Sequence, residues 1–383
     1  MIVNIIGFLL FFLHQVRVSL AADPCESKCT FTSGVLTSKT IGSFPTTCPR
    51  VCTSKLFIEY NSALTEPQLT TAFKNMKTLA GGLEVSGTEF TSLKFLAGLE
   101  KIESEMDYIS ISNNSKMVEL GMTALKNISG IDFAVYDNKK MTQLNLPNLK
   151  TMRFSGDPKL LENAGPSSPG SFNTYIYIDT NHPTNFCVTG DELKTFMLSN
   201  PENILAVHGK VCPPAKFTPK ICKAPAETCE ELYGDLNIGA KFAVKKVQNL
   251  KILYGSIIMK NTNFTNFKFL KNLTHIVQMN QNKLIMDIQG NKKLINITFP
   301  KLQLIVCDTY DIKTSKAKDV LVFKNNNKAL LQAQESCYSI AHVLHEYDMG
   351  NPKVNGLLCY ELEKAPTTKK ATTKKATTKK ASG

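Results

Sequence analysis

The apolar positions of one stretch of this chain recur 174 residues later in the same order. Residues 83–102 read LEVSGTEFTSLKFLAGLEKI, and residues 257–276 read IIMKNTNFTNFKFLKNLTHI. Segments 90–96 and 264–270 share Phe-Thr-x-x-Lys-Phe-Leu, whereas most of the polar positions around them differ. This many matches in one register indicate an internal duplication, so we expect two similar halves.

A shorter repeat of 24 residues starts at Asn114 and at Asn138, and Asn291 begins the same pattern in the second half. A short alternating apolar stretch precedes each asparagine, at residues 109–111, 133–135 and 285–288. Apolar residues follow each asparagine after three, six, eleven and fourteen positions: Met117, Met141 and Leu294; Leu120, Leu144 and Ile297; Leu125, Leu149 and Leu302; Ile128, Met152 and Ile305.

This pattern predicts one coil of a solenoid, in which a short strand points alternate side chains inward and spaced apolar residues fill the interior. An asparagine suits the corner because its short amide tolerates left-handed backbone and bonds neighbouring peptide groups. Leucine-rich repeats share this period and this asparagine. Here the strand positions favour Ile, Phe and Val, and only a few coils fit between the cysteines. We therefore predict a mainly β fold with short helices, built as two tandem, short, leucine-rich-repeat-like β-helices.

Helix-start signals place three helices. Thr65-Glu-Pro-Gln68 is a capping box with an early proline, and Thr189-Gly-Asp-Glu192 is a second capping box. The third helix is expected around SIAHVLHEY at residues 339–347, in the place that matches the second helix. Since cysteines flank the last two, each half is expected to end in a helix that a disulfide clips.

Eleven cysteines gather at the borders of two cysteine-poor stretches, which is typical of disulfides in an exported protein. The spacings Cys25-x3-Cys29 and Cys48-x3-Cys52 leave zinc as an alternative. Cys307 is interpreted as a buried small hydrophobic residue, with an intermolecular disulfide as the alternative. The ten cysteines assigned to disulfides, with the pairing among the first four open, are Cys25, Cys29, Cys48, Cys52, Cys187, Cys212, Cys222, Cys229, Cys337 and Cys359.

The chain begins with an apolar run at residues 5–13, and Ser19-Leu20-Ala21 provides a signal-peptidase site, although no Lys or Arg precedes the run. We expect residues 1–21 to be a cleaved signal peptide and the product to be secreted. Five glycosylation sequons fit that compartment: Asn113, Asn127, Asn263, Asn272 and Asn296.

Much of the formal charge of +13 belongs to the C-terminal repeat of Ala-Thr-Thr-Lys-Lys. Without Arg17 and the six lysines of residues 365–383 the charge is +6, and no basic stripe with aromatics points to nucleic acid. The tail is expected to be disordered, as a glycosylated stalk, a basic patch for acidic glycans or membranes, or a spacer. No membrane span is expected. The predicted organisation is signal peptide 1–21, first domain 22–212, linker 213–221, second domain 222–362 and tail 363–383.

Spaced motifs recur in both halves: Cys52-x3-Leu56-x-Ile58 and Cys229-x6-Leu236-x-Ile238; Leu83-x-Val85; Phe95-Leu96-x2-Leu99-x2-Ile102 and Phe269-Leu270-x2-Leu273-x2-Ile276; NKKMTQLNLPNLKTM at 138–152 and NKKLINITFPKLQLI at 291–305. In these motifs the chain resembles the receptor L domains of the insulin and epidermal-growth-factor receptors, and most closely nematode proteins with two such domains in tandem. The resemblance implies that each β-helix is right-handed. Those receptors separate their L domains by a long cysteine-rich region, whereas nine residues lie between Cys212 and Cys222 here. Their clamp geometry is therefore not implied.

The resemblance also implies a function: capture of an insulin-like or epidermal-growth-factor-like peptide, or of a receptor partner, as a decoy or co-receptor. In the related receptors ligand contacts the flat sheet face of the first L domain. Aromatic residues tend to anchor interfaces, so Phe57 and Tyr136 are the main candidates. The outward positions expected there are Phe57, Glu59, Glu84, Ser86, Ser110, Ser112, Ala134 and Tyr136.

The sequence also allows two other function classes. A β-helix enzyme acting on polysaccharides needs stacked carboxylates, but each outward column has one acid and no arginine. His342-x-x-His345 lacks the spacing of a zinc protease motif. We therefore expect no enzyme activity, no cofactor and no metal. The remaining alternative is a matrix or adhesion protein that its basic tail holds to acidic glycans.

Overall fold

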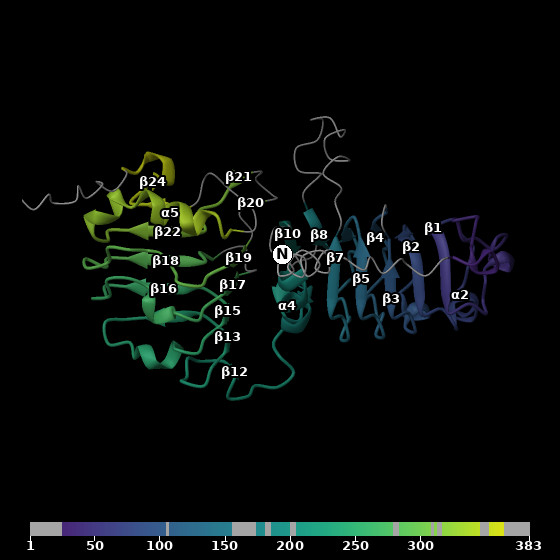
Figure 1. The fold of residues 1–383 in the computed structure, drawn as a ribbon, viewed down its shortest axis with the longest axis horizontal. Coiled ribbons are helices and arrows are strands. Elements are labelled where there is room, and N and C mark those ends of the chain that lie inside the picture. Colours follow the sequence, from purple (N-terminus) through teal and green to yellow (C-terminus); the bar gives the residue numbers. More distant parts are fainter. Residues whose placement is uncertain are drawn as a thin grey trace, which may run out of the picture.

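The computed structural model describes residues 25–104, 107–154, 174–180, 185–199, 204–278, 283–307, 310–311, 316–344 and 352–363. The expected signal peptide, His345 and the lysine repeat of the tail lie outside these ranges. The described part is mainly β, with three α-helices and several sheets. Figure 1 shows the two halves of the chain side by side, each with its own set of strands.

The described helices are α2 (Glu66–Phe73), α4 (Gly190–Ser199) and α5 (Gln334–Ala341). The strands of the first half are β1 (Arg50–Glu59), β2 (Thr78–Ser86), β3 (Lys101–Glu103), β4 (Ile109–Ser112), β5 (Asn127–Gly130), β6 (Phe133–Tyr136), β7 (Thr151–Phe154), β8 (Thr174–Asp179), β9 (Cys187–Val188), β10 (Ile204–His208) and β11 (Lys210–Val211). Those that follow are β12 (Ile221–Cys222), β13 (Glu231–Tyr233), β14 (Leu236–Ile238), β15 (Ile252–Tyr254), β16 (Ile257–Lys260), β17 (His275–Gln278), β18 (Met286–Gln289), β19 (Leu304–Cys307), β20 (Tyr310–Asp311), β21 (Lys316–Ala317), β22 (Leu321–Lys324), β23 (Lys353–Val354) and β24 (Leu357–Leu358). Single 3-10 turns are η1 (Ser27–Cys29), η2 (Ile41–Ser43), η3 (Lys94–Leu96), η4 (Val244–Val247), η5 (Lys268–Leu270), η6 (Lys328–Gln332) and η7 (Cys359–Glu361).

The sheet of the first half turns a corner within β2. The first residues of β2 pair in parallel with β3, and its last four pair in parallel with β4, so two rows of strands diverge from it: β2-β3-β5-β7 and β2-β4-β6-β8-β10. Gly81 lies between the two parts with φ +149, and a Cβ there would lie 2.0 Å from the carbonyl oxygen of Thr53 in β1. Only glycine fits this approach between the two strands.

The second half divides in the same way, into the sheets β12-β13-β15-β17-β19 and β14-β16-β18-β22-β23-β24. Gly255, which the duplication aligns with Gly81, separates β15 from β16. A Cβ on Gly255 would lie 2.4 Å from the carbonyl oxygen of Gly234 in the turn below. The duplication thus places a glycine at the same corner of both halves.

A ladder of buried amides closes the opposite corner. The Oδ1 atom of Asn138 accepts from the backbone N–H of Asn114 at 3.0 Å, and the Oδ1 of Asn114 accepts from that of Thr88 at 2.9 Å. The second half repeats the ladder with Asn326, Asn291 and Thr262, again at 2.9 Å per step. Because the three members of each ladder satisfy one another and nearby carbonyls, these polar groups are buried at little cost.

The sequence pattern predicts left-handed backbone at the ladder asparagines, but the structure has it at the residue before each of them. Asn113 and Asp137 have positive φ, of 57° and 55°, whereas the ladder residues Asn114 and Asn138 do not. Gly290 has φ +70 immediately before Asn291. The corner therefore uses two residues with separate tasks: the first reverses the chain, and the second bonds the neighbouring turn.

The spaced apolar residues form the core as predicted. All positions aligned after the ladder asparagines are buried, with at most 9% of the side chain exposed, except Leu302, which packs half-buried against the core. Phe90 and Phe95 meet with ring centroids 5.3 Å apart, and their duplicates Phe264 and Phe269 meet at 4.7 Å. The polar changes between the halves therefore left the interior contacts in place.

The cap and disulfide predictions are confirmed. Thr65 caps α2 in a capping box, and Thr189 with Glu192 caps α4. The five disulfides join Cys25 to Cys52, Cys29 to Cys48, Cys187 to Cys212, Cys222 to Cys229 and Cys337 to Cys359. The zinc alternative is therefore wrong, because all four of its cysteines are oxidised in pairs. Cys307 is buried in β19, with 4% exposed.

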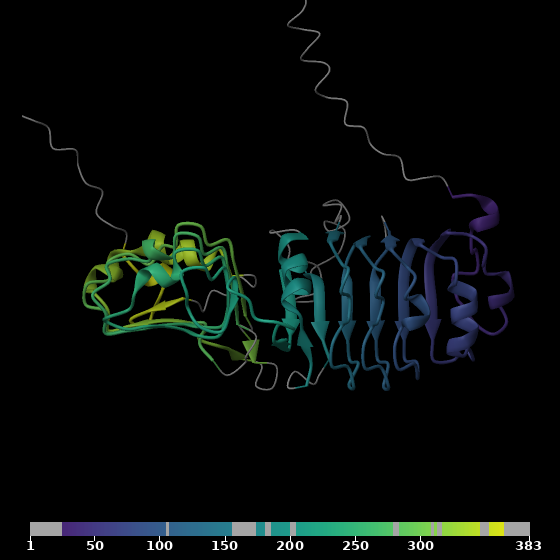
Figure 2. The same cartoon turned by 90° about the horizontal axis from the view of Figure 1, so that it is seen from below.

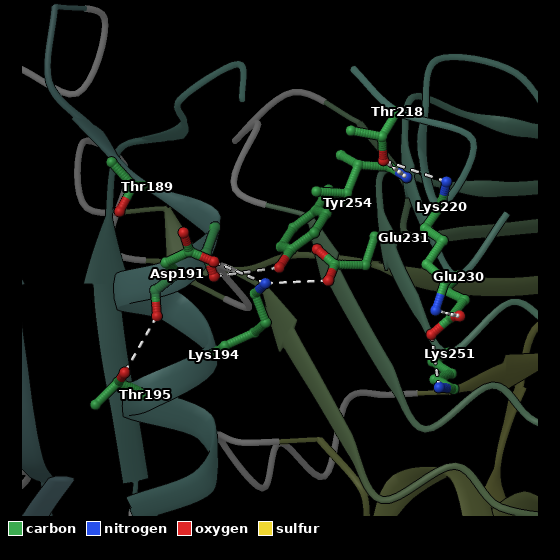
Figure 3. A network of polar contacts seen from close by, with 12 residues as sticks. Thr189, Asp191, Lys194, Thr195, Thr218, Lys220, Glu230, Glu231, Lys251 and Tyr254 are labelled. Atoms are coloured by element: carbon green, nitrogen blue, oxygen red, sulfur yellow. Dashed lines mark hydrogen bonds and ion pairs between the residues drawn. The ribbon is translucent and has the colours of Figure 1, made fainter. Parts of the chain in front are cut away.

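The two halves dock through one outward column of the sheet β13-β15-β17-β19. In this column Tyr233, Tyr254, Val277 and Val306 stand side by side, and their side chains pack against the core of the first half. Figure 3 shows Lys194 of α4 reaching across to Glu231, with Nζ 3.0 Å from Oε1, while it also pairs with Asp191. An apolar column with an ion pair beside it thus fixes α4 on the second half.

Candidate ligand-binding face

The candidate face is the outward side of the row β1-β2-β4-β6-β8-β10, whose strands stand side by side in Figure 2. Parallel pairing in register brings the predicted residues into two columns, Phe57/Glu84/Ser110/Ala134 and Glu59/Ser86/Ser112/Tyr136. Strand β8 extends these columns to Tyr177 and Asp179, and β10 extends the second column to His208.

The predicted residues differ in how far a ligand can reach them. Phe57, Glu84, Ala134 and Tyr136 are half-buried, as are Glu59 and Ser86. Ser110 and Ser112 are 6% and 3% exposed, because these short side chains lie between longer neighbours. Ser86 and Ser112 also share a hydrogen bond of 3.3 Å. Contacts on this face therefore fall mainly to the residues at the two ends of the columns.

An ordered polar group lies beside the first column. Lys55 Nζ donates to the hydroxyl of Tyr108 at 2.7 Å, and that hydroxyl donates to Glu84 Oε2 at 2.8 Å. Lys55 also pairs with Glu84 at 3.1 Å and lies over the Tyr108 ring, 4.0 Å from its centroid. Burial works to lower the pKa of Lys55, but its hydrogen bonds with Tyr108 and Glu84 outweigh burial and leave the pKa raised. The group therefore keeps Lys55 charged and ordered beside Glu84.

Aromatic rings gather at the other end of the face. The ring centroids of Tyr136 and Tyr177 are 6.1 Å apart, and those of Tyr177 and His208 are 6.3 Å apart. The Tyr177 hydroxyl donates to Asp179 at 3.4 Å. Burial, together with the negative charge of Asp179, raises the pKa of Tyr177 to about 12. This end offers flat apolar area with polar edges, the composition of interface anchors.

Several residues of this face were missed by sequence reasoning. Tyr177, Asp179 and His208 follow residues 155–173, which interrupt the 24-residue period. The alternation in TYIYID (174–179) was the signal that could have identified them. Tyr60, at the corner after β1, was also missed, although 76% of it is exposed. No periodic signal marks Tyr60, because it lies outside the strand.

A second acid, Asp132, lies near Asp107 at the edge of this polar group. The backbone carbonyl of Asp132 accepts from the N–H of Ile109, and the Asp132 Oδ1 atom is buried with no hydrogen-bond partner among the described residues. Burial raises the pKa of Asp132 to about 6, and the nearby charge of Asp107 adds to the effect. Asp107 in turn lies 3.7 Å from Lys55. Asp132 directly precedes β6, so a group that changes charge in mildly acidic solution lies at the edge of the candidate face.

The acid and the histidine that a catalytic or metal site would use lie far apart in the sequence and are placed as follows. Glu84 is engaged by Lys55 and Tyr108, so the acid of its column is already paired. No group of three or more His, Cys, Asp or Glu residues in the described ranges is placed to hold a metal ion. His342 is exposed beside Tyr338, and its predicted companion His345 lies outside the described residues.

The five sequons fall into two groups. Asn113, Asn263 and Asn296 are exposed. The side-chain amides of Asn127 and Asn272 instead donate hydrogen bonds, to Thr151 at 2.6 Å and to the carbonyl oxygen of Gln248 at 2.7 Å. An N-linked glycan is attached to this same nitrogen, which Asn127 and Asn272 use here for a hydrogen bond.

Comparison with known proteins gives one match. A protein-family model described as Receptor L domain matches residues 47–132 and residues 228–340, which together make up just over half of the chain. No curated protein matches, and no solved structure matches, so no relative tests the likeness to nematode proteins. Within the described residues, no helix is both long and apolar enough to cross a membrane.

Proposed function

This chain belongs to the receptor L domain family, and on that premise we propose that it is an extracellular, non-catalytic binding protein whose first half captures a peptide growth factor of the insulin-like or epidermal-growth-factor-like kind. A cell-surface receptor is the other partner that the family favours. In either case the protein modulates signalling as a decoy or a co-receptor. Five disulfides accord with an extracellular site of action.

The observation that carries this proposal is the composition of the candidate face. Two in-register columns join Phe57 at one end to Tyr136, Tyr177 and His208 at the other. Rigid aromatic side chains lose little conformational entropy on binding, which is why they dominate interface energetics. Glu59 lies two residues from Phe57 on the same strand, β1, so we expect the ligand to present a basic side chain at this end of the face.

We also propose an architecture for the two halves, one of which carries the candidate face. Each half is a short right-handed β-helix, with the first domain over 22–212, a linker at 213–221 and the second domain over 222–362. The parallel register, the corner glycines and the two amide ladders support this assignment. In such a stack the flat row of strands is rigid, so the ligand meets a preformed surface.

A binding screen tests the function. The secreted chain is immobilised, and panels of insulin-like and epidermal-growth-factor-like peptides are followed by interferometry. Saturable binding to one class, weakened at least tenfold by Phe57→Ala or Tyr136→Ala, is the expected result. Tyr360→Ala is the matched control, because Tyr360 is 56% exposed in the second half. Absence of binding to both panels would remove the peptide ligand class.

A further inference from the structure

The two halves differ sharply in charge although they share their core pattern. Residues 236–307 contain eleven lysines and a single acidic residue, Asp287. Residues 62–133, the span of equal length that begins 174 positions earlier, contain six lysines and nine acidic residues. The two halves therefore share their interior pattern, but the second carries a large excess of positive charge.

Most of these lysines have no carboxylate to neutralise them. All eleven are exposed. Three form ion pairs: Lys251 with Glu230 at 2.6 Å, Lys260 with Asp287 at 2.7 Å and Lys283 with Asp235 at 3.0 Å. Across the part of the chain that the structure describes, no carboxylate lies within ion-pair distance of the other eight. Their charges repel one another and attract anions from solution.

Five of the eight lie on successive stacked turns and form what we call the lysine ridge: Lys245, Lys246, Lys268, Lys271 and Lys301. The first two belong to η4, which packs against η5, where Lys268 lies and which Lys271 ends.

Two hydrogen bonds connect the successive turns that carry the lysine ridge. Asn272 Nδ2 donates to the carbonyl oxygen of Gln248 at 2.7 Å, and Lys301 Nζ donates to Asn272 Oδ1 at 3.4 Å. Parallel turns stack about 4.8 Å apart, so the charges follow one another in a row.

The fold that the two halves share does not require the lysine ridge, because the first half lacks it. Lys94 occupies the position in the first half that matches Lys268, and it forms an ion pair with Glu119 at 2.6 Å. Ala97 occupies the position that matches Lys271. The first half thus neutralises or omits the charges that the second half leaves unpaired.

We propose that the lysine ridge is a binding site for a linear sulfated polysaccharide, laid along the stack of turns. A row of compact ammonium groups at short, regular spacing matches a chain that carries an anion on each repeat. Exposed lysines gain most of this affinity by releasing counterions from the polyanion, so binding needs no deep pocket. The site is separate from the candidate face and from the lysine repeat of the tail.

The test measures binding of the full secreted chain to immobilised heparan sulfate, by interferometry at about 0.15 M NaCl and over a salt series. The ridge variant replaces its five lysines with Gln. The matched control also loses five positive charges, from exposed lysines of the first half that form no ion pair with any described residue: Lys39, Lys74, Lys139, Lys140 and Lys150. A third variant replaces the six lysines of residues 365–383.

We expect the ridge variant to bind at least tenfold more weakly, with the slope of log Kd against log salt falling by about one for each contacting lysine lost. The first-half control should stay within about threefold of wild type. If the variant with all five ridge lysines replaced unfolds at a lower temperature than wild type, the double variant Lys268→Gln/Lys271→Gln should still weaken binding several-fold.

Three results would overturn the proposal. Equal losses in the ridge and control variants would mean that only net charge matters. A loss confined to the tail variant would move the site to the tail. Tighter ridge-dependent binding to phosphatidylserine vesicles than to heparan sulfate would identify an anionic membrane as the partner.

The binding series is repeated after enzymatic removal of N-glycans, because Asn263 and Asn296 are exposed in the same half. Binding seen only after glycan removal would count against the site in the secreted protein.

Discussion

The hydroxyl of Tyr254 in β15 donates to the carbonyl oxygen of Gly190 in α4, 3.3 Å away, and so joins residues 64 positions apart on opposite sides of the junction between the halves. Burial raises the pKa of this hydroxyl, and the neighbouring Tyr233 adds to the effect. The duplication aligns Tyr254 with Ala80 and Val277 with Glu103. One outward column therefore became apolar in the second half, and that column is the one that docks.

A side chain on Gly190 should loosen this junction. A Cβ there would lie 1.9 Å from the Tyr233 hydroxyl and 3.2 Å from that of Tyr254, so Gly190→Ala has to displace the half-buried Tyr233 ring. We expect a loss of about 1–3 kcal/mol in the free energy of unfolding and a larger radius of gyration by small-angle X-ray scattering.

Gly239→Ala serves as the control for this change, because no atom lies within 4 Å of its added Cβ. It should leave the radius of gyration and the stability unchanged. If Gly190→Ala behaves in the same way, the junction does not depend on the close approach of Tyr233.

The amide ladder should be sensitive to a single truncation. Asn138 is fully buried; its Oδ1 accepts from Asn114, and its Nδ2 donates to the carbonyl oxygen of Ile111 at 2.8 Å. Asn138→Ala leaves both partners buried and unsatisfied, so we expect a loss of about 2–4 kcal/mol in chemical denaturation. Asn148→Ala removes one exposed hydrogen bond, to Thr123, and should cost less than about 1 kcal/mol. Equal costs would show that the ladder adds nothing beyond an ordinary surface contact.

Asp132 should make stability depend on pH in mildly acidic solution. Its pKa is raised to about 6 in the folded protein, so between roughly pH 4 and 6 the folded state binds more protons than the unfolded state. The free energy of unfolding therefore falls as pH rises through this window.

Asp132→Asn should remove this slope and stabilise the protein at pH 7, by on the order of 1–2 kcal/mol after allowance for partial solvent screening. Urea denaturation of wild type and variant at pH 4, 5, 6 and 7 measures the effect. A variant that keeps the slope of wild type would assign the pH dependence to another group.

Glycan occupancy should follow the side-chain hydrogen bonds. Asn113, Asn263 and Asn296 are exposed, so we expect glycans on them in the protein made by secretory cells. We expect little occupancy at Asn127 and Asn272, whose amide nitrogens are already bonded. Glycopeptide mass spectrometry measures each site. High occupancy at Asn272 would show that its hydrogen bond forms after modification is complete or is easily broken.

The sequence predicted the repeat, the core and the caps because each depends on residues close together in the chain. The apolar spacing after Asn114 and the capping box at Thr65 are local signals of this kind. The junction was not predicted, because Tyr254 alternates like any strand residue and its partner Gly190 is remote. The lysine ridge was missed for a related reason: its members are scattered over 57 positions and align only when the turns stack.

The docked junction also determines how a partner with two binding elements would meet this protein. Because Tyr254 and its column hold the halves together, the candidate face and the lysine ridge are presented at one separation, although only nine residues connect Cys212 to Cys222. A growth factor already attached to a sulfated chain would meet the second site at a high effective concentration. Avidity would then depend on whether the spacing within that complex fits the junction.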